Sequence, residues 1–127
     1  MSHVVLDSGA LIALERNDRG LWAALKVAAR RNADVLVPAT VLAQVWRGTA
    51  RQARLSLALQ HCVIASFDQL AREVGELCGR ARTTDVCDAH VALVAATRAQ
   101  VLYTSDPDDM RRLIVACRAG RPTIVRC

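Results

Sequence analysis

Aspartates recur in three short segments of this sequence: Val4-Val5-Leu6-Asp7-Ser8-Gly9, Asp85-Val86-Cys87-Asp88 and Thr104-Ser105-Asp106-Pro107-Asp108-Asp109. Two segments place the acid after an apolar, strand-like run, and all three place it where a helical pattern begins. In a parallel α/β sheet such positions converge at one edge, outside the carboxyl ends of the strands. Carboxylates gathered there repel each other unless a hard cation such as Mg²⁺ or Mn²⁺ neutralises them. The pattern therefore indicates a metal-dependent nuclease.

Each aspartate also has a structural interpretation, because Asp is a favoured N-cap and an anion near a helix N-terminus contributes about 0.3–1 kcal/mol. Asp85 with Asp88 three residues later resembles a capping box. Asp106 precedes a proline, with Asp109 at the third helical position. Capping does not require the segments to converge, whereas two-metal phosphodiester hydrolysis does. Taken together, the segments favour a shared site.

The apolar periodicity predicts alternating strands and helices. The expected strands cover residues 3–6, 35–37, 63–65, 101–104 and 123–125, and the expected helices cover 10–15, 19–31, a segment from Pro38 to Gly48, 51–60, 67–81, 85–98 and 107–118. This alternation predicts an α/β sandwich with a mostly parallel sheet of four to five strands flanked by helices. At 127 residues, with no linker or repeat, the chain is expected to be a single domain spanning 1–127.

Composition narrows the functional classes. The net charge is +5, and every basic residue except Lys26 is arginine. An acidic site in a basic protein fits a phosphodiester substrate, although arginines can equally serve as solvated helix-surface residues. No apolar stretch reaches the roughly 18–20 residues of a membrane span, and no signal peptide pattern is present, so a cytoplasmic protein is expected.

The sulfur and imidazole groups do not form a recognisable metal site. The five cysteines make an odd count without a C-x-x-C pair, which indicates reduced thiols rather than disulfides or zinc. The three histidines are scattered, and His90, two residues past Asp88, is expected to be structural or solvated. Oxygen ligands from the aspartates therefore remain the candidate metal donors.

The chain resembles a PIN domain, and within that family the VapC-type toxins of bacterial toxin–antitoxin (VapBC) pairs. The resemblance spans essentially the whole length and rests on the segments 5–12, 37–45, 88–92 and 101–106, in that order. It implies a three-layer PIN-like sandwich and an Mg²⁺- or Mn²⁺-dependent endoribonuclease that hydrolyses RNA phosphodiester bonds with metal-activated water. It also implies a cognate VapB-like antitoxin whose C-terminal segment covers the active-site mouth, and a homodimer.

The resemblance also implies residue roles. The family's first, third and fourth acids match Asp7, Asp88 and Asp106, which would be the catalytic metal ligands. Two flanking acids, Asp85 and Asp109, could supply an additional ligand directly or through water. Two hydroxyls, Ser8 and Thr104, could orient a carboxylate or a metal-bound water, or could serve only in helix capping or turns.

Gln44 departs from the family pattern, which usually has a glutamate in this place. A neutral amide coordinates a cation only through its carbonyl and cannot act as a base, so it would weaken metal affinity or restrict the site to one ion. This departure favours an alternative function, a catalytically weak or inactive PIN-fold module that binds RNA or a protein. A phosphatase of the haloacid-dehalogenase type fits poorly, because the second acid it needs would be at Gly9.

Basic and aromatic residues lie close to Gln44 in the sequence. Trp46 and Arg47 form a pair that could stack on a base and grip a phosphate near the site, although packing of Trp46 in a core or a dimer interface is the simpler interpretation. Arg47, Arg51 and Arg54 have the spacing i, i+4, i+7, which predicts one helix face that is either solvated or in contact with RNA.

Overall fold

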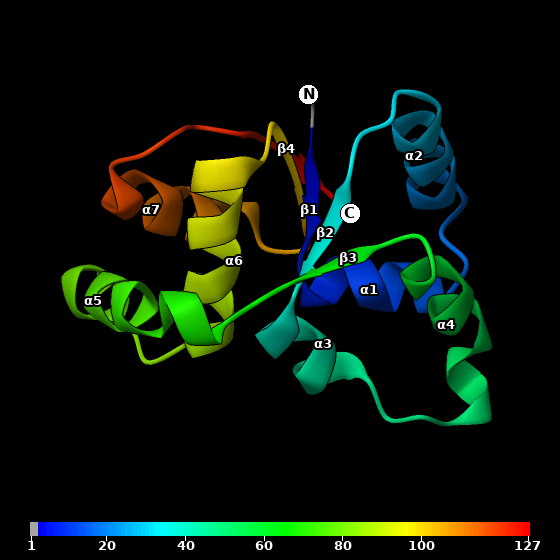
Figure 1. The fold of residues 1–127 in the computed structure, drawn as a ribbon, viewed down its shortest axis with the longest axis horizontal. Helices are drawn as coiled ribbons and strands as arrows, with labels where there is room; N and C mark the ends of the chain where they lie inside the picture. Colours follow the sequence, from blue (N-terminus) through cyan, green and yellow to red (C-terminus); the bar gives the residue numbers. More distant parts are fainter. Residues whose placement is uncertain (1–2) are drawn as a thin grey trace.

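The computed structural model describes residues 3–127, which form a parallel sheet between two groups of helices (Figure 1). The strands are β1 (Val4–Leu6), β2 (Val35–Pro38), β3 (Val63–Ala65), β4 (Val101–Thr104) and β5 (Thr123–Arg126). The helices are α1 (Ser8–Glu15), α2 (Arg19–Arg30), α3 (Ala39–Val45), η1 (Ala50–Gln52), α4 (Ala53–Leu59), η2 (Asp68–Leu70), α5 (Ala71–Ala81), α6 (Val86–Arg98) and α7 (Pro107–Cys117). Across residues 3–127, no helix has the length and apolar character to cross a membrane.

The sheet has the strand order β3-β2-β1-β4-β5, and every neighbouring pair is parallel. The chain moves outward from β1 to β3 on one side and then returns to place β4 on the other side of β1. The order therefore reverses between β1 and β4, and ligands of open α/β sheets bind in the crevice at such a reversal. Asp7 directly follows β1, and its N–H donates to the carbonyl of Tyr103 in β4 at 3.2 Å.

Helices cover both faces of the sheet. In Figure 1, α5, α6 and α7 lie on one side of the strands and α1, α2 and α4 on the other. Helix α3 contacts both α1 and α6, so it connects the two layers beyond the end of β2. The segment 89–96 of α6 is buried on every side, which requires small and branched apolar residues because the sheet, α5 and α7 all pack closely against this helix.

The predicted element order is confirmed, with two local differences. Helix α3 ends at Val45, because Trp46 takes an extended conformation, and Gly48 lies in the following loop with φ of 73°. The expectation that this helix continues to Gly48 was therefore wrong. The predicted arginine face was also wrong, since Arg47 lies in this loop, Arg51 in η1 and Arg54 in α4.

Candidate active site

Asp7 is a buried carboxyl group at the sheet reversal, with a side chain 3% exposed. It is the N-cap of α1, and its Oδ1 accepts a hydrogen bond from the backbone N–H of Ala10 at 2.9 Å. Burial raises the pKa of Asp7 above its ordinary value, although hydrogen bonds from the Thr104 hydroxyl and from backbone N–H groups act in the opposite direction. The Asp7 carboxylate is thus held by neutral hydrogen-bond donors, while its burial disfavours the charged form.

Asp88 is half-buried in the first turn of α6. Its backbone N–H donates to Oδ1 of Asp85, the N-cap of this helix, at 2.9 Å. Burial, followed by the charge of Asp85, raises the pKa of Asp88 to about 7, and the charges of Asp7 and Asp109 add to the shift. The structure therefore brings carboxyl groups from three helix N-termini close enough to repel one another.

Asp106 and Asp109 lie together at the start of α7. Asp106 caps this helix, with its Oδ1 3.4 Å from the N–H of Asp109, and its own N–H donates to the hydroxyl of Thr104 at 2.9 Å. A hydrogen bond with Asp106, and then the charge of Asp106, raise the pKa of Asp109, while Arg112 lowers it. Asp109 is the α7 acid whose charge acts on Asp88.

The capping and shared-site interpretations are thus compatible. Asp7, Asp85 and Asp106 each accept a backbone N–H at a helix start, and the same helix starts converge at one edge of the sheet. The charge of Asp109, which the sequence analysis treated as a flanking acid, also raises the pKa of Asp88. A metal-binding role for Asp106 and for the other acids stays a prediction.

The oxygen donors at this edge suit Mg²⁺ or Mn²⁺ rather than a soft metal. Within residues 3–127, no group of three or more acidic, histidine or cysteine side chains is placed so that it could hold a metal ion by itself. Mg²⁺ typically retains several waters and binds through one or two carboxylates, so an incomplete protein shell with further acids nearby is compatible with it. Asp7 and Asp88 are the central candidates, because the pKa of each is raised by burial and the charge of Asp7 acts on Asp88.

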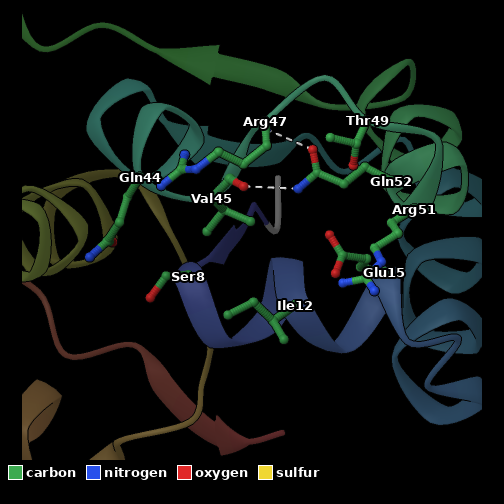
Figure 2. Close-up of a pocket in the computed structure, with 9 residues that line it drawn as sticks. All are labelled: Ser8, Ile12, Glu15, Gln44, Val45, Arg47, Thr49, Arg51 and Gln52. Atoms are coloured by element: carbon green, nitrogen blue, oxygen red, sulfur yellow. Dashed lines mark hydrogen bonds between the residues drawn. The ribbon is translucent and has the colours of Figure 1, made fainter.

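A cavity of about 500 Å³ adjoins this edge. It lies between α1 and the segment that runs from the end of α3 to η1, as Figure 2 shows. Ser8, the residue after Asp7, lines it together with the exposed Gln44. The complete lining is Ser8, Ile12, Glu15, Gln44, Val45, Arg47, Thr49, Arg51 and Gln52.

Gln52 shapes this cavity, and sequence reasoning missed it. The side chain is 5% exposed, and its Oε1 accepts from the backbone N–H groups of Arg47 at 2.7 Å and Gly48 at 3.2 Å. Its Nε2 donates to the carbonyl of Val45 at 2.8 Å. The buried amide of Gln52 therefore provides hydrogen-bond partners for the backbone groups at the end of α3. These contacts explain why the helix ends before Gly48. The available signal in the sequence was Gly48 itself, because glycine readily adopts the positive φ that this loop has.

We expect Gln52→Leu to lower the free energy of unfolding by about 1–3 kcal/mol, because backbone groups of Val45, Arg47 and Gly48 lose their partner. Urea unfolding measures this change. Gln69→Leu, on the exposed surface of η2, is the matched control and should change stability little. Equal effects of the two substitutions would contradict the role of Gln52.

His90 is structural, with a fully buried ring. Its Nε2 lies 3.1 Å from the carbonyl oxygen of Ser66, which can only accept, so Nε2 carries the hydrogen and Nδ1 accepts from the Thr40 hydroxyl at 2.8 Å. Burial lowers the pKa of His90, which keeps the imidazole neutral. These contacts hold the first turns of α6, including Asp88, against the start of α3 and the residue after β3.

Comparison with known proteins supports the architecture. The sequence matches no protein-family model and no curated protein. The structure is similar to a chain in the crystal structure of VapBC2 from Rickettsia felis bound to a DNA fragment from their promoter, with a TM-score of 0.70, 15% sequence identity and coverage of 98% of both chains. At this identity the likeness shows a shared fold, and the predicted PIN-like α/β fold is confirmed.

Proposed function

We propose that this protein is a VapC-like endoribonuclease that depends on Mg²⁺ or Mn²⁺ and acts as the toxin of a VapBC-type pair. The observation that carries the proposal is the convergence of Asp7, Asp85, Asp88 and Asp109 at the sheet reversal, where burial and mutual repulsion raise the pKa of Asp88 to about 7. Such a concentration of disfavoured negative charge is typical of a cation site. The fold shared with a VapBC2 chain adds support.

The residues of the site have distinct tasks in this proposal. Asp7 and Asp88 would hold the cation, with Asp109 and Asp85 beside them and Asp106 as a further ligand. When bound, Mg²⁺ or Mn²⁺ would supply the missing positive charge and the Lewis acidity that activates water for attack on phosphorus. Helix capping fixes where each carboxylate stands, which is the preorganisation that electrostatic catalysis requires.

Thr104 has a positioning task in this proposal. Its buried side chain hydrogen-bonds Asp7 and also accepts the N–H of Asp106 at 2.9 Å. One residue at the end of β4 thus links the acid after β1 to the acid that starts α7. Ser8, at the first position of α1 and in the cavity lining, would act on the substrate side.

The partners of the site follow from the same proposal. RNA would be the substrate. A VapB-like antitoxin would be the partner, since the similar Rickettsia felis structure is one of VapBC2, and a basic side chain of this partner would lie against the acidic cluster. A homodimer in the cytoplasm is the expected form.

Metal dependence is tested by RNA cleavage. Purified protein should cleave a mixed RNA pool with Mn²⁺ and lose this activity in EDTA. Equal cleavage in both conditions would overturn the metal-dependent mechanism.

A second candidate is a PIN-fold module that binds RNA or a protein with little catalysis. Gln44 favours this candidate, because a neutral amide stands where the family usually has a glutamate.

We expect Gln44→Glu to raise both Mn²⁺ affinity and cleavage about tenfold, because it adds a charged oxygen ligand beside Ser8. Mn²⁺-dependent thermal shifts and initial cleavage rates measure this change. Gln60→Glu, exposed at the end of α4, adds the same charge elsewhere and should have no effect. Identical behaviour of the two variants would remove Gln44 from the site.

A further inference from the structure

The cavity beside the acidic edge contains two arginines. Figure 2 shows Ser8 and Gln44 at one end and Glu15 and Arg51 at the other, with Arg47 between them along the opposite wall. Ser8 and Glu15 are the first and last residues of α1, so the cavity follows this helix for about 10 Å. It therefore leads from the acidic edge past Arg47 to the end that Arg51 and Glu15 line.

These arginines are available to an anionic ligand. Both are exposed, and in the described chain, residues 3–127, neither forms a salt bridge. Arg47 uses one guanidinium nitrogen to donate to the carbonyls of Trp46 at 2.7 Å and Ala43 at 3.3 Å. A guanidinium has five N–H donors, so further donors stay free while the group is held in place. Glu15 offsets part of the charge, and the lining as a whole is positive.

The cavity wall that carries Arg47 is held in place by side-chain hydrogen bonds. The buried Gln52 hydrogen-bonds the backbone of Val45, Arg47 and Gly48, so the backbone around Arg47 is fixed by three contacts. Trp46, 38% exposed next to Arg47, is an aromatic surface on which an unpaired base can stack. A fixed cation beside an exposed tryptophan suits a single nucleic-acid strand better than a peptide.

We infer that this cavity binds the RNA backbone beside the cleavage position, with Arg47 and Arg51 as positioning residues that contact phosphates. The inference rests on the proposed function for the location of cleavage at the acidic edge. Arginine pairs with phosphate in a bidentate geometry, and each phosphate contact releases counterions from the nucleic acid. Binding through this cavity must therefore depend on salt.

The test is fluorescence anisotropy with a 3′-fluorescein single-stranded RNA 12-mer of mixed sequence, in EDTA so that the RNA stays intact. For single strands, loss of one phosphate contact lowers the slope of log K against log salt by about 0.7, which at 0.1 M salt is about a fivefold rise in Kd. Arg47→Gln and Arg51→Gln should each show this change, and the double variant should show about twice the loss of slope. Arg47→Lys should restore most of the slope.

Arg54→Gln is the matched control, because Arg54 is an exposed arginine of α4 outside the cavity lining. An unchanged slope and Kd for this variant support the inference. Equal losses for Arg54→Gln, or no loss for the cavity variants, would overturn it. A labelled decaglutamate peptide serves as a third arm, and arginine-dependent binding of this peptide with unaffected RNA binding would assign the cavity to an acidic peptide instead.

Cleavage assays with Mn²⁺ on the same proteins separate the two proposals. If RNA binding depends on Arg47 and Arg51 but the wild type does not cleave, the cavity inference stands as an RNA site and the nuclease proposal fails. If the wild type cleaves and the arginine variants keep its KM and salt dependence, the nuclease proposal stands and the cavity inference fails.

Discussion

Asp88→Asn is expected to reduce Mn²⁺-dependent RNA cleavage by about 100-fold or more. Asp88 is the carboxyl group on which the charges of Asp85, Asp7 and Asp109 act together, so a cation at this edge loses its central ligand when this charge is removed. Initial cleavage rates with Mn²⁺ and with EDTA measure the effect. Circular dichroism checks that the fold is intact, which the half-buried position of Asp88 in α6 should allow.

The same substitution should have the opposite effect on stability. Without metal, Asp88→Asn removes a carboxyl group whose charge is disfavoured by burial and by neighbouring acids, so it should raise the melting temperature. It should also remove the stabilisation that Mn²⁺ gives to the wild type. Glu76→Gln, exposed on α5, is the matched control and should leave cleavage and the Mn²⁺ response unchanged. Full cleavage by Asp88→Asn would exclude Asp88 from the site.

The burial of Asp88 and its repulsion by neighbouring acids also predict a pH dependence of stability. The folded-state pKa of about 7 lies above the ordinary value of 3.8, so between these values the folded protein binds more protons than the unfolded chain. The stability due to this group is fully present below pH 3.8 and is lost as the pH rises through about 7. Metal-free wild type should therefore melt at a higher temperature at pH 5 than at pH 8. A wild-type difference no larger than that of Asp88→Asn would show that the pKa of Asp88 is not raised in the folded protein.

Local signals predicted most of the fold. The strand–aspartate–helix units at Asp7 and Asp106 were readable because apolar runs, caps and a proline at the first helical turn act within a few residues. The end of α3 could not be predicted from local signals, because it depends on the side chain of Gln52, seven residues beyond Val45. The prediction that Arg47, Arg51 and Arg54 share one helix face was wrong for the same reason, because it assumed a continuous helix and the contacts of Gln52 interrupt that helix.

The candidate site shows a similar division. Convergence of the acids was predictable, because parallel strands place their carboxyl ends at one edge and the reversal between β1 and β4 puts Asp7 beside the start of α7. Which acids at the start of α7 act on Asp88 was harder to predict. The sequence spacing is compatible with Asp106 or Asp109, and the charge of Asp109 is among those that raise the pKa of Asp88.

A close approach of backbones at Gly9 leads to the second large effect. A Cβ at Gly9 would overlap the Ser105 side chain and lie 3.2 Å from the backbone nitrogen of Ser105. Gly9→Ala should therefore lower the free energy of unfolding by about 1–3 kcal/mol, as overpacking does. The backbone N–H groups of Gly9 and Ser105 both hydrogen-bond Asp7, so the overlap separates the donors that hold this carboxylate. A displacement near 1 Å can reduce cleavage by about 100-fold.

Two other glycines make this prediction specific. Gly75 and Gly79 lie in α5, and apart from the adjacent backbone of this helix no atom would lie within 4 Å of a Cβ at either position. Alanine there should raise stability by about 0.5–1 kcal/mol and leave cleavage unchanged. Ser105→Gly should recover part of the stability and cleavage lost in Gly9→Ala, because it removes the atoms that the new Cβ meets. Urea unfolding and cleavage rates of this set measure both effects. If Gly9→Ala behaved like Gly75→Ala, the contact between α1 and the residue after β4 would not position Asp7.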